Sequence, residues 1–364
     1  MRVLFLNQYF PPDPAPTGVL LAEIGAALAA RGHTVDFVAA RQEYRAGQKQ
    51  GGRMFREALA LGRMLLDGLR RPRAEVVVSA SSPPCLLVVA TLVAGWHRAR
   101  SVHWVMDLYP EIAVALGEVR EGALSRILGV LMGWCYRRAS RVVVLDEDMA
   151  ARLRTHGIEP AIVRPWVFAP VLKQLAAAAP ELHRGWTWIY SGNLGRAHEW
   201  ETLLQAQAEL ERRGAPIRLL FQGGGPSRPA AEARSRELGL RQVEWRDYVP
   251  ELELPAALLR CQALVVTQLP AAQGLLWPSK LGLAISLPRP LAWVGPTDGA
   301  VAELLRAFPH AAVFAPGQPG PLANWLRTQQ TAGTAVSANA VFDASAHRAE
   351  SVAAMLQLIA AEAR

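Results

Sequence analysis

Two glycines, an amide and an arginine lie close together in a short loop that reads GNLGR and follows an apolar run ending at Tyr190. Gly192 and Gly195 let a backbone approach a ligand closely, Asn193 can donate and accept hydrogen bonds, and an arginine is permanently charged. A pattern of helical spacing follows, so we expect Arg196 near a helix N-terminus, where N–H groups favour anions. These residue types in this order predict a cradle for a diphosphate group.

A second glycine-rich turn ends another apolar run. The stretch Ile217–Gln222 is typical of a strand and is followed by Gly223, Gly224 and Gly225, where a similar anion site is expected. Neither loop has the GxGxxG spacing of dinucleotide-binding folds or the pattern of a P-loop, so those two kinds of nucleotide site are not indicated. A plain turn is the alternative interpretation of both loops.

The stretch Gln273–Leu305 holds further residues suited to phosphate and sugar contacts. Ser279 and Lys280 stand between a proline and a helical pattern, where a hydroxyl, an ammonium and backbone N–H groups can contact one phosphate together. Glu303 belongs to a later predicted helix, and its carboxylate could accept hydrogen bonds from the vicinal hydroxyls of a ribose. The alternative for Glu303 is a solvated helix residue.

A histidine and an aspartate stand four residues apart in the stretch SVHWVMD, which has the composition of a strand. Alternation along a strand places His103 and Asp107 on one face, near the carboxyl end of the strand. Groups of these types at a sheet edge are candidates for acid–base or orienting roles. The alternatives are a satisfied buried histidine and an aspartate that caps the next turn.

The first predicted strand, Arg2–Asn7, leads into a stiff loop with four prolines. Thr17 and Gly18 then open a predicted helix, whose unpaired N–H groups can meet an anion. The alternative is a turn in which Thr17 caps that helix.

Two aspartates, Asp146 and Asp148, have the spacing of a metal-binding DxD pair. They follow a predicted strand and precede a helix start, where acidic side chains stabilise the first turn. We therefore interpret them as capping residues, and we predict no protein-held metal and no cofactor.

The composition suits a folded protein with anionic partners. Of 364 residues, 51% are apolar and 19% charged, and the net charge is +8, which favours phosphates, nucleic acid or acidic lipid. The cysteines (Cys85, Cys135 and Cys261) are odd in number and far apart, which excludes a disulfide framework and indicates a reducing compartment. No signal-peptide core fits the N-terminus. The longest apolar stretch, Cys85–Trp96, is too short to span a membrane and predicts a buried helix.

Short β-branched runs alternate with helical stretches in both halves of the chain, which predicts α/β domains with parallel sheets. A proline- and alanine-rich passage separates the halves. We predict a first domain over residues 1–165, a linker over 166–182, a second domain over 183–345 and a terminal helix over 346–364. Ligands are expected beyond the carboxyl ends of the strands.

Several of these motifs together resemble the family 4 glycosyltransferases. The stretches VLFLNQYFPPDPAPTG, YSGNLGRAHEWETLLQA and PSKLGLAISLPRPLAWVG carry the resemblance, which is greatest to the branch that builds bacterial surface polysaccharides on lipid carriers. It implies a GT-B fold: two Rossmann-like domains facing a cleft, with the C-terminal helix crossing back to the N-terminal domain. It also implies metal-independent transfer of a sugar with retention of anomeric configuration.

The resemblance implies a role for each candidate residue. Arg196 and Lys280 would face the donor diphosphate, and Gly192 and Asn193 would line it. Gly18 would lie near the phosphates and Glu303 near the ribose, and His103 and Asp107 would line the acceptor side. The sequence departs from the family where two glutamates seven residues apart are usual, since the segments 271–274 and 281–283 contain none. His198 and Glu199 also stand where a lysine is common.

Two basic, apolar segments of helical spacing, 52–73 and 124–141, suit an interfacial position on anionic lipid. The alternative is an ordinary domain helix with a cationic edge. No nucleic-acid module is present, so no nucleic-acid partner is expected.

We therefore expect a UDP-sugar donor, of N-acetylhexosamine or deoxy-sugar type, and a lipid-linked saccharide or polyprenyl phosphate acceptor. The expected location is the cytoplasmic face of the inner membrane, on anionic lipid. Two alternatives stay open: an enzyme like UDP-N-acetylglucosamine 2-epimerase, and a catalytically silent scaffold subunit of a glycan assembly complex. The missing glutamate pair favours the scaffold, and the scarcity of carboxylates disfavours the epimerase.

Overall fold

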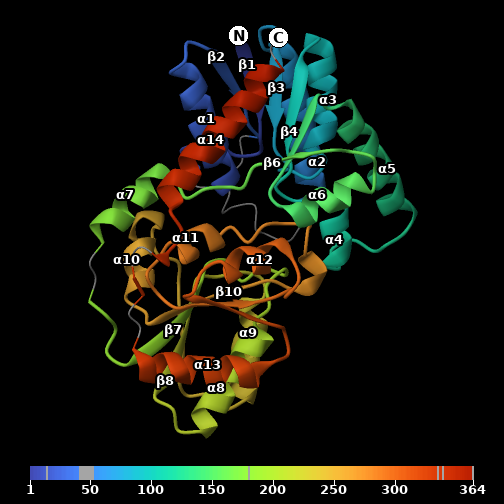
Figure 1. Cartoon of the computed structure of the whole chain (residues 1–364). Helices are drawn as coiled ribbons and strands as arrows, with labels where there is room; N and C mark the ends of the chain where they lie inside the picture. Colours follow the sequence, from blue (N-terminus) through green and yellow to red (C-terminus); the bar gives the residue numbers. More distant parts are fainter. Residues whose placement is uncertain (14, 41–52, 179–180, 334–335, 338–339, 363–364) are drawn as a thin grey trace. The chain divides into compact units, whose positions relative to one another are not determined.

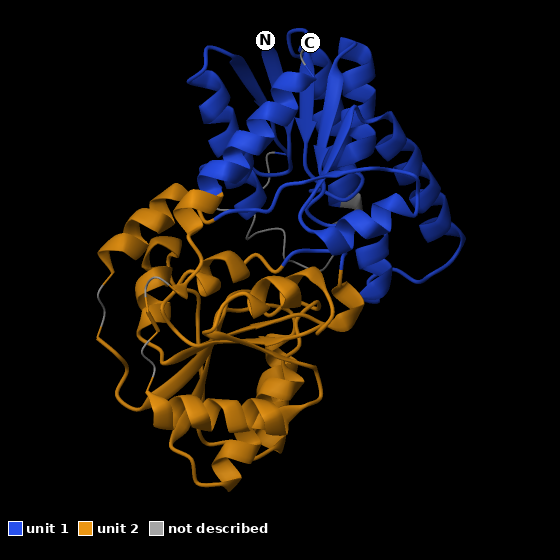
Figure 2. Cartoon of the chain, in the orientation of Figure 1, with its two compact units in different colours: residues 1–166, 274–277, 348–364 blue, residues 167–273, 278–347 orange. Residues whose placement is uncertain are grey.

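The computed structural model describes residues 1–13, 15–40, 53–178, 181–333, 336–337 and 340–362. For residues 53–55 it describes the backbone only. The backbone divides into two compact units, which Figure 2 colours separately. Unit 1 comprises Met1–Trp166, Gly274–Trp277 and Arg348–Arg364; unit 2 comprises Val167–Gln273 and Pro278–His347.

Unit 1 is built on a six-stranded parallel sheet in the order β2-β1-β3-β4-β5-β6. Its strands are β1 (Arg2–Leu6), β2 (Thr34–Val38), β3 (Val76–Ser79), β4 (Arg100–Trp104), β5 (Arg141–Val144) and β6 (Ala161–Ile162). The central strands are apolar at consecutive positions because helices cover both faces of the sheet; all four residues of β3 are buried.

Helices cover the sheet of unit 1 (Figure 1). They are α1 (Pro16–Ala29), α2 (Arg53–Arg70), α3 (Leu86–His97), α4 (Glu111–Ala115), α5 (Ala123–Arg138), α6 (Glu147–Arg154) and, from the end of the chain, α14 (Ala344–Ala361). Helices α2 and α3 share a buried cluster with β1 and β3, and α3 packs against both α2 and α5. Helix α14 lies beside α1, where Arg348 pairs with Glu23 at 2.9 Å.

Unit 2 repeats the architecture, with a parallel sheet in the order β12-β11-β10-β7-β8-β9. Its strands are β7 (Trp186–Ser191), β8 (Ile217–Gln222), β9 (Val243–Arg246), β10 (Ala263–Thr267), β11 (Leu291–Val294) and β12 (Ala311–Phe314). Its helices are α7 (Ala169–Ala177), α8 (Glu201–Arg212), α9 (Arg228–Glu237), η2 (Glu251–Glu253), α10 (Leu254–Leu259), η3 (Pro270–Ala272), α11 (Leu281–Ile285), α12 (Ala300–Arg306) and α13 (Pro319–Ala332). Helices α8 and α13 contribute to the main buried cluster of this unit.

The α/β class and the two parallel sheets predicted from the sequence are confirmed. The segment predicted as a linker contains helix α7. The stretch Cys85–Trp96, predicted as a buried helix, forms α3 but is buried on one face only, since Leu92 and Trp96 are exposed. Among the described residues, no helix is both long and apolar enough to cross a bilayer.

Candidate functional site

Two glycine-rich loops run side by side at the carboxyl ends of β7 and β8 in unit 2. The N–H of Gly192 donates to the carbonyl of Gln222 at 2.7 Å, and the N–H of Leu194 donates to the carbonyl of Gly224 at 2.6 Å. The parallel pairing of β7 with β8 brings the two loops to the same edge of the sheet. The structure therefore joins the two loops that the sequence singled out separately.

The glycines of these loops are required by the backbone and by close contacts. Gly192 has φ of 127° and Gly223 has φ of 129°, values that side chains rarely tolerate. A Cβ at Gly192 would lie 1.9 Å from Cε of Lys280, and a Cβ at Gly223 would lie 2.2 Å from the carbonyl oxygen of Gly192. A Cβ at Gly224 would lie 3.1 Å from Cε2 of the Tyr248 ring. The two loops thus form one tightly packed surface.

Lys280 lies against the first of these loops. Its Nζ donates to the hydroxyl of Tyr190 at 2.8 Å and to the carbonyl of Asn193 at 3.0 Å, and it lies 4.7 Å from the centroid of the Tyr190 ring. The hydroxyl of Tyr190 in turn donates to the same carbonyl at 3.0 Å. Removal from water disfavours the charged amine, so burial lowers the pKa of Lys280 to about 7.

His198 faces Lys280 from the other end of the loop. Its Nδ1 lies 3.0 Å from the carbonyl of Thr267, and its Nε2 lies 3.4 Å from Nζ of Lys280. A carbonyl only accepts, so Nδ1 carries the proton and Nε2 presents a lone pair to the ammonium. Burial, and then the charge of Lys280, lowers the pKa of His198 to about 3, so the ring is neutral. His198 therefore accepts from the ammonium without repelling it.

Arg196 lies in the same loop but points to solvent. Its side chain is exposed, and within the described ranges it makes no ion pair. The expected position near a helix N-terminus is wrong, because α8 begins only at Glu201. Glu199 sets that start by accepting from the N–H and the hydroxyl of Thr202 at 2.8 and 2.9 Å. Arg196 is thus a cation on the loop rather than part of a helix terminus.

Asn193 is held by the aromatic side chain that covers the second loop. Its Oδ1 accepts from the hydroxyl of Tyr248 at 3.2 Å. Gly195 is half-buried, and a Cβ there would be 3.4 Å from Nδ2 of Asn193. The amide side chain therefore lies across the surface of the loop, between Gly195 and Tyr248.

Ser279 and Glu303 are both exposed. Ser279 is in the turn before α11, but α11 has only five residues, so the expected contribution from a helix N-terminus is slight. Glu303 lies in the first turn of α12. The structure brings Lys280 onto the glycine loops and gives neither Ser279 nor Glu303 a side-chain partner within the described residues.

His103 is enclosed in unit 1 at the end of β4. Its Nδ1 lies 2.8 Å from the hydroxyl of Ser79 on the neighbouring strand β3. Its Nε2 is buried and has no hydrogen-bond partner in the described part of the chain. Burial lowers the pKa of His103 to about 3, so the imidazole is neutral. The Nε2 atom is thus an enclosed polar atom without a partner among the described residues.

Asp107 shares a narrow hollow with His103, as the alternation along the strand predicts. The side chains that line the hollow leave no space for a water-sized sphere between them; they are Ser81, Cys85, Leu86, Leu87, His103, Asp107, Tyr109, Met132 and Tyr136. Burial raises the pKa of Asp107 to about 6. The backbone of Asp107 forms an antiparallel bridge with Leu276, four residues before Lys280 along the chain.

Gly18 lies in the first turn of α1 and is buried. A Cβ there would be 2.4 Å from the carbonyl oxygen of Tyr9, and this contact with the preceding loop is enough to require a glycine. The interpretation of Thr17 as a helix cap is wrong: α1 begins at Pro16, and Asp13 accepts from the N–H of Ala15 at 3.0 Å.

Asp146 caps α6 as predicted, and Asp148 lies in the first turn of that helix. Its Oδ1 accepts from the N–H of Met149 at 2.7 Å. In the described ranges, no three histidine, cysteine or carboxylate side chains are grouped so that they could hold a metal ion.

Replacing Asp146 with alanine is expected to lower the free energy of unfolding by about 1 kcal/mol, because the N–H of Met149 loses its acceptor. Asp146→Asn keeps an acceptor oxygen and is expected to cost much less. Urea unfolding of both variants measures the difference. Equal losses in the two variants would show that the charge, not the cap, stabilises this turn.

Parts of the chain are similar to known proteins. Residues 17–166 match the glycosyl transferase 4-like domain. The probable glycosyltransferase WbjE of Pseudomonas aeruginosa is 26% identical over 236 residues, which cover 61% of this chain and 58% of that protein. The chain thus matches less than two-thirds of the length of this relative.

Two solved structures share the fold over nearly the whole chain. Alr3699/HepE of Anabaena, in complex with UDP-glucose, has 17% identity and a TM-score of 0.65 over 99% of this chain and 98% of that one. WaaG, a glycosyltransferase involved in lipopolysaccharide biosynthesis, has 16% identity and a TM-score of 0.60 over 99% of each chain. The resemblance seen in the sequence is confirmed: residues 17–166 match the glycosyl transferase 4-like domain, and the chain, with its two Rossmann-like units, shares the GT-B fold of these structures.

Proposed function

We propose that the protein is a retaining, metal-independent glycosyltransferase of cell-surface polysaccharide synthesis. It moves a sugar of N-acetylhexosamine or deoxy-sugar type from a UDP-sugar to a lipid-linked saccharide or polyprenyl phosphate at the cytoplasmic face of the inner membrane. The observation that carries the proposal is the position of Lys280 on the glycine loops of unit 2. The complex of the HepE protein with UDP-glucose supports a uridine diphosphate donor.

The loops of unit 2 stabilise the leaving group in this proposal. The bond between the anomeric carbon and the diphosphate breaks, and its electron pair stays on the β-phosphate oxygen. Fixed cations and N–H groups aimed at this developing charge supply the largest part of the rate enhancement in such sites. Lys280 and Arg196 are the cations, and the backbone around Gly192 and Gly223 lets the diphosphate come close.

The acceptor binds beside His103 and Asp107 of unit 1, and the side chains that fill the hollow between them must move to admit it. The incoming hydroxyl forms the new bond to the anomeric carbon on the face that the diphosphate leaves, and its proton passes to the leaving phosphate oxygen, which gives retention. Nε2 of His103 and the carboxylate of Asp107 hold the sugar or the hydroxyl in place. Both residues are positioned by β4 and the turn that follows it.

The pH dependence of kcat/KM tests these assignments, because it reports the ionisation of the free enzyme. Asp107, with a pKa of about 6, loses its charge below pH 6, and Lys280, with a pKa of about 7, loses its charge above pH 7. We expect kcat/KM to fall on both sides of this interval, and Asp107→Asn to remove only the acidic limb. An acidic limb that is unchanged in Asp107→Asn would exclude this residue from the reaction.

Donor-dependent transfer is the test of the proposed function. The purified chain is incubated with a panel of UDP-sugars and a bacterial lipid extract, with and without a chelator, and the labelled lipid product is counted. We expect transfer from at least one donor, equal with and without chelator. Transfer from no nucleotide sugar, combined with UDP binding, would favour the scaffold alternative, and conversion of UDP-N-acetylglucosamine to its 2-epimer would favour the epimerase.

A further inference from the structure

The outer face of helices α3 and α5 in unit 1 is apolar. Of the thirteen large apolar side chains that are exposed among the described residues, seven lie on these two helices. We call this surface the α3–α5 face; its members are Leu92, Trp96, Leu124, Ile127, Val130, Leu131 and Trp134. The side chain of Val130 is 72% exposed and that of Trp96 is 69% exposed. Such a concentration marks an interaction site.

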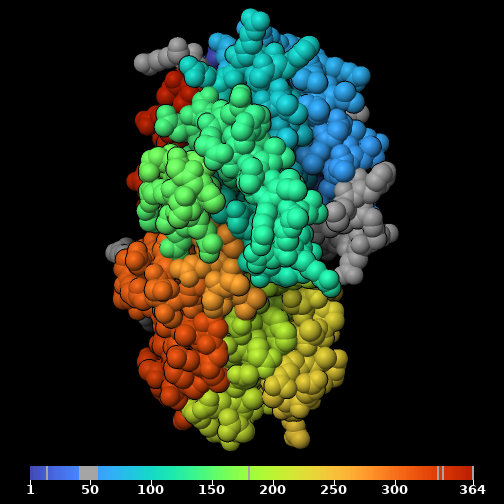
Figure 3. All heavy atoms as spheres, turned by 90° about the vertical axis from the view of Figure 1, so that its right-hand side faces the viewer, coloured from blue at the N-terminus to red at the C-terminus, as the bar shows by residue number. Residues whose placement is uncertain are grey.

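The exposed side chains of each helix are spaced at the helical repeat. Leu92 and Trp96 of α3 are four residues apart and so lie on one side of that helix, at the margin of the side whose Val89 and Val93 belong to the buried cluster. On α5, Met132 and Cys135 are buried. The two helices pack against each other, and the outer side of α5 faces the viewer in Figure 3 as a blue-green surface.

The charge of the α3–α5 face has one sign. Helix α5 carries Arg126, Arg137 and Arg138, all exposed, and neither α3 nor α5 contains an acidic residue. The guanidinium of Arg138 lies over the ring of Trp134, 4.5 Å from its centroid. An arginine stacked on an exposed tryptophan suits the boundary between headgroups and acyl chains, where the ring enters the apolar layer and the cation meets phosphate.

We propose that the α3–α5 face is a docking surface for an anionic lipid bilayer. The apolar side chains of α5 and α3 enter the interface, and the arginines of α5 bind lipid phosphates. Helix α5 belongs to the segment 124–141 that the sequence predicts to contact lipid, whereas α3 was expected to be buried and the segment 52–73 is not part of this face. The docking does not depend on the proposed reaction, so either can fail without the other.

Sedimentation with lipid vesicles tests the proposal. The full chain is mixed with vesicles of phosphatidylcholine alone, or with about one third phosphatidylglycerol, which supplies the negative surface that attracts arginines. We expect the chain to sediment with the anionic vesicles and far less with the neutral ones. Val130→Asp is expected to weaken the binding at least tenfold. In the double variant Arg137→Gln with Arg138→Gln, the loss of each arginine is expected to weaken the binding by about fivefold.

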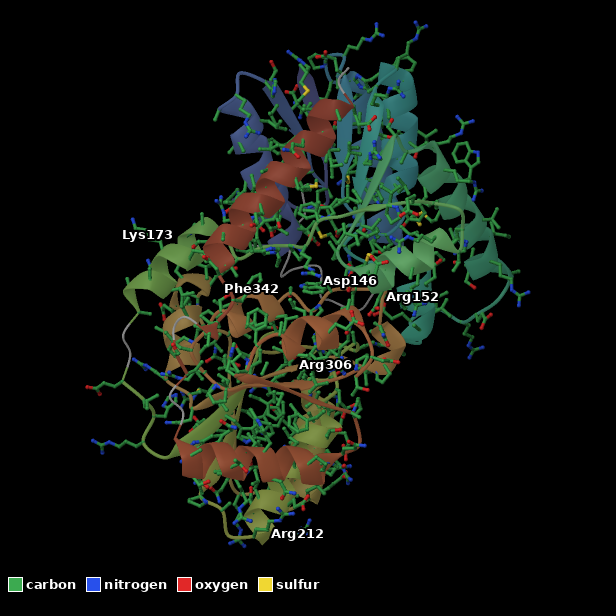
Figure 4. All side chains as sticks on the ribbon, viewed as in Figure 1. Asp146, Arg152, Lys173, Arg212, Arg306 and Phe342 are labelled. Atoms are coloured by element: carbon green, nitrogen blue, oxygen red, sulfur yellow. The ribbon has the colours of Figure 1, made fainter. Side chains whose placement is uncertain are left out.

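Matched changes elsewhere serve as controls. Leu252 in η2 of unit 2 is also exposed, at 50%, so Leu252→Asp places the same charge on another apolar surface position. Arg212, labelled at the bottom of Figure 4, is an exposed arginine of α8, and Arg212→Gln removes a charge there. Both controls are expected to leave vesicle binding unchanged.

Three outcomes would overturn the proposal. The first is equal sedimentation with neutral and anionic vesicles, and the second is a loss in Leu252→Asp as large as that in Val130→Asp. The third is a dimer in light scattering that Val130→Asp converts to a monomer, which would make the face an interface between two copies of the chain. Thermal unfolding of Val130→Asp checks that the variant is folded.

Discussion

Replacing Lys280 with methionine is expected to lower kcat for sugar transfer by about 10²–10³-fold, the effect typical of removing one fixed donor from a developing negative charge. The methionine reaches as far as Cε of the lysine and keeps its apolar contacts, so the ring of Tyr190 stays covered. What is lost is the Nζ donor, which lies 2.8 Å from the Tyr190 hydroxyl and 3.0 Å from the Asn193 carbonyl. Steady-state kinetics with a UDP-sugar donor measures the change.

Proton uptake gives a second readout of the same residue. Because burial lowers the pKa of Lys280 to about 7, the amine is mostly neutral at pH 8 in the free protein. A bound diphosphate favours the charged form, so UDP binding at pH 8 is expected to take up close to one proton and to weaken as the pH rises above 7. Calorimetry in two buffers of different ionisation enthalpy measures the uptake, which Lys280→Met abolishes.

Lys173 supplies the matched control for Lys280. It is an exposed lysine of α7 in the same unit, labelled in Figure 4. Lys173→Met is expected to leave both kcat and the proton uptake unchanged. If Lys280→Met and Lys173→Met behave alike, the ammonium of Lys280 has no part in the reaction.

Replacing Gly192 with alanine is expected to lower kcat/KM by about 10²-fold, because it displaces Lys280. The added Cβ would lie 1.9 Å from Cε of Lys280, and the φ of 127° is strained for any side chain. The strain is also expected to lower the free energy of unfolding by about 1–3 kcal/mol. Kinetics and urea unfolding of the single variant measure the two effects.

Gly214 separates backbone strain from the displacement of Lys280. It also has a positive φ, 66°, but a Cβ there would meet nothing within 4 Å. Gly214→Ala is expected to cost stability while leaving kcat/KM unchanged. Because Gly192→Ala acts through Lys280, the double variant Gly192→Ala with Lys280→Met should be no slower than Lys280→Met alone. Additive losses would mean that Gly192 acts on the donor independently of Lys280.

The residue types of the two glycine-rich loops could be predicted from the sequence, but the partners of these residues could not. Glycines after predicted strands and a lysine after a proline carry local signals. Tyr190 and His198 contact a lysine 90 and 82 residues further along the chain, so these contacts depend on the order of strands in the sheet. The sequence indicates a role for His198 only through its place in a loop where family 4 glycosyltransferases commonly have a lysine.

The starts of helices are hard to predict from the apolar pattern, because single side chains outside that pattern decide them. Glu199 accepts from the N–H of Thr202 and so fixes the start of α8 five residues after Arg196. For α3, an almost wholly apolar sequence left no periodicity to separate the inner side from the outer one. The sequence therefore does not distinguish the exposed Leu92 and Trp96 from the buried valines of α3. The packing of α3 against α2 and α5 determines which of these side chains are covered.

In the proposed reaction, unit 2 holds the donor diphosphate with Lys280 and the two glycine-rich loops. A crystal structure of the full chain with UDP, grown in the presence of a chelator, would show the position of the diphosphate. We expect a diphosphate oxygen within hydrogen-bonding distance of Nζ of Lys280, next to the backbone of Gly192 and Gly223, with Arg196 turned toward it. Density for the diphosphate away from both glycine loops, with Lys280 still bound only to Tyr190 and Asn193, would contradict it.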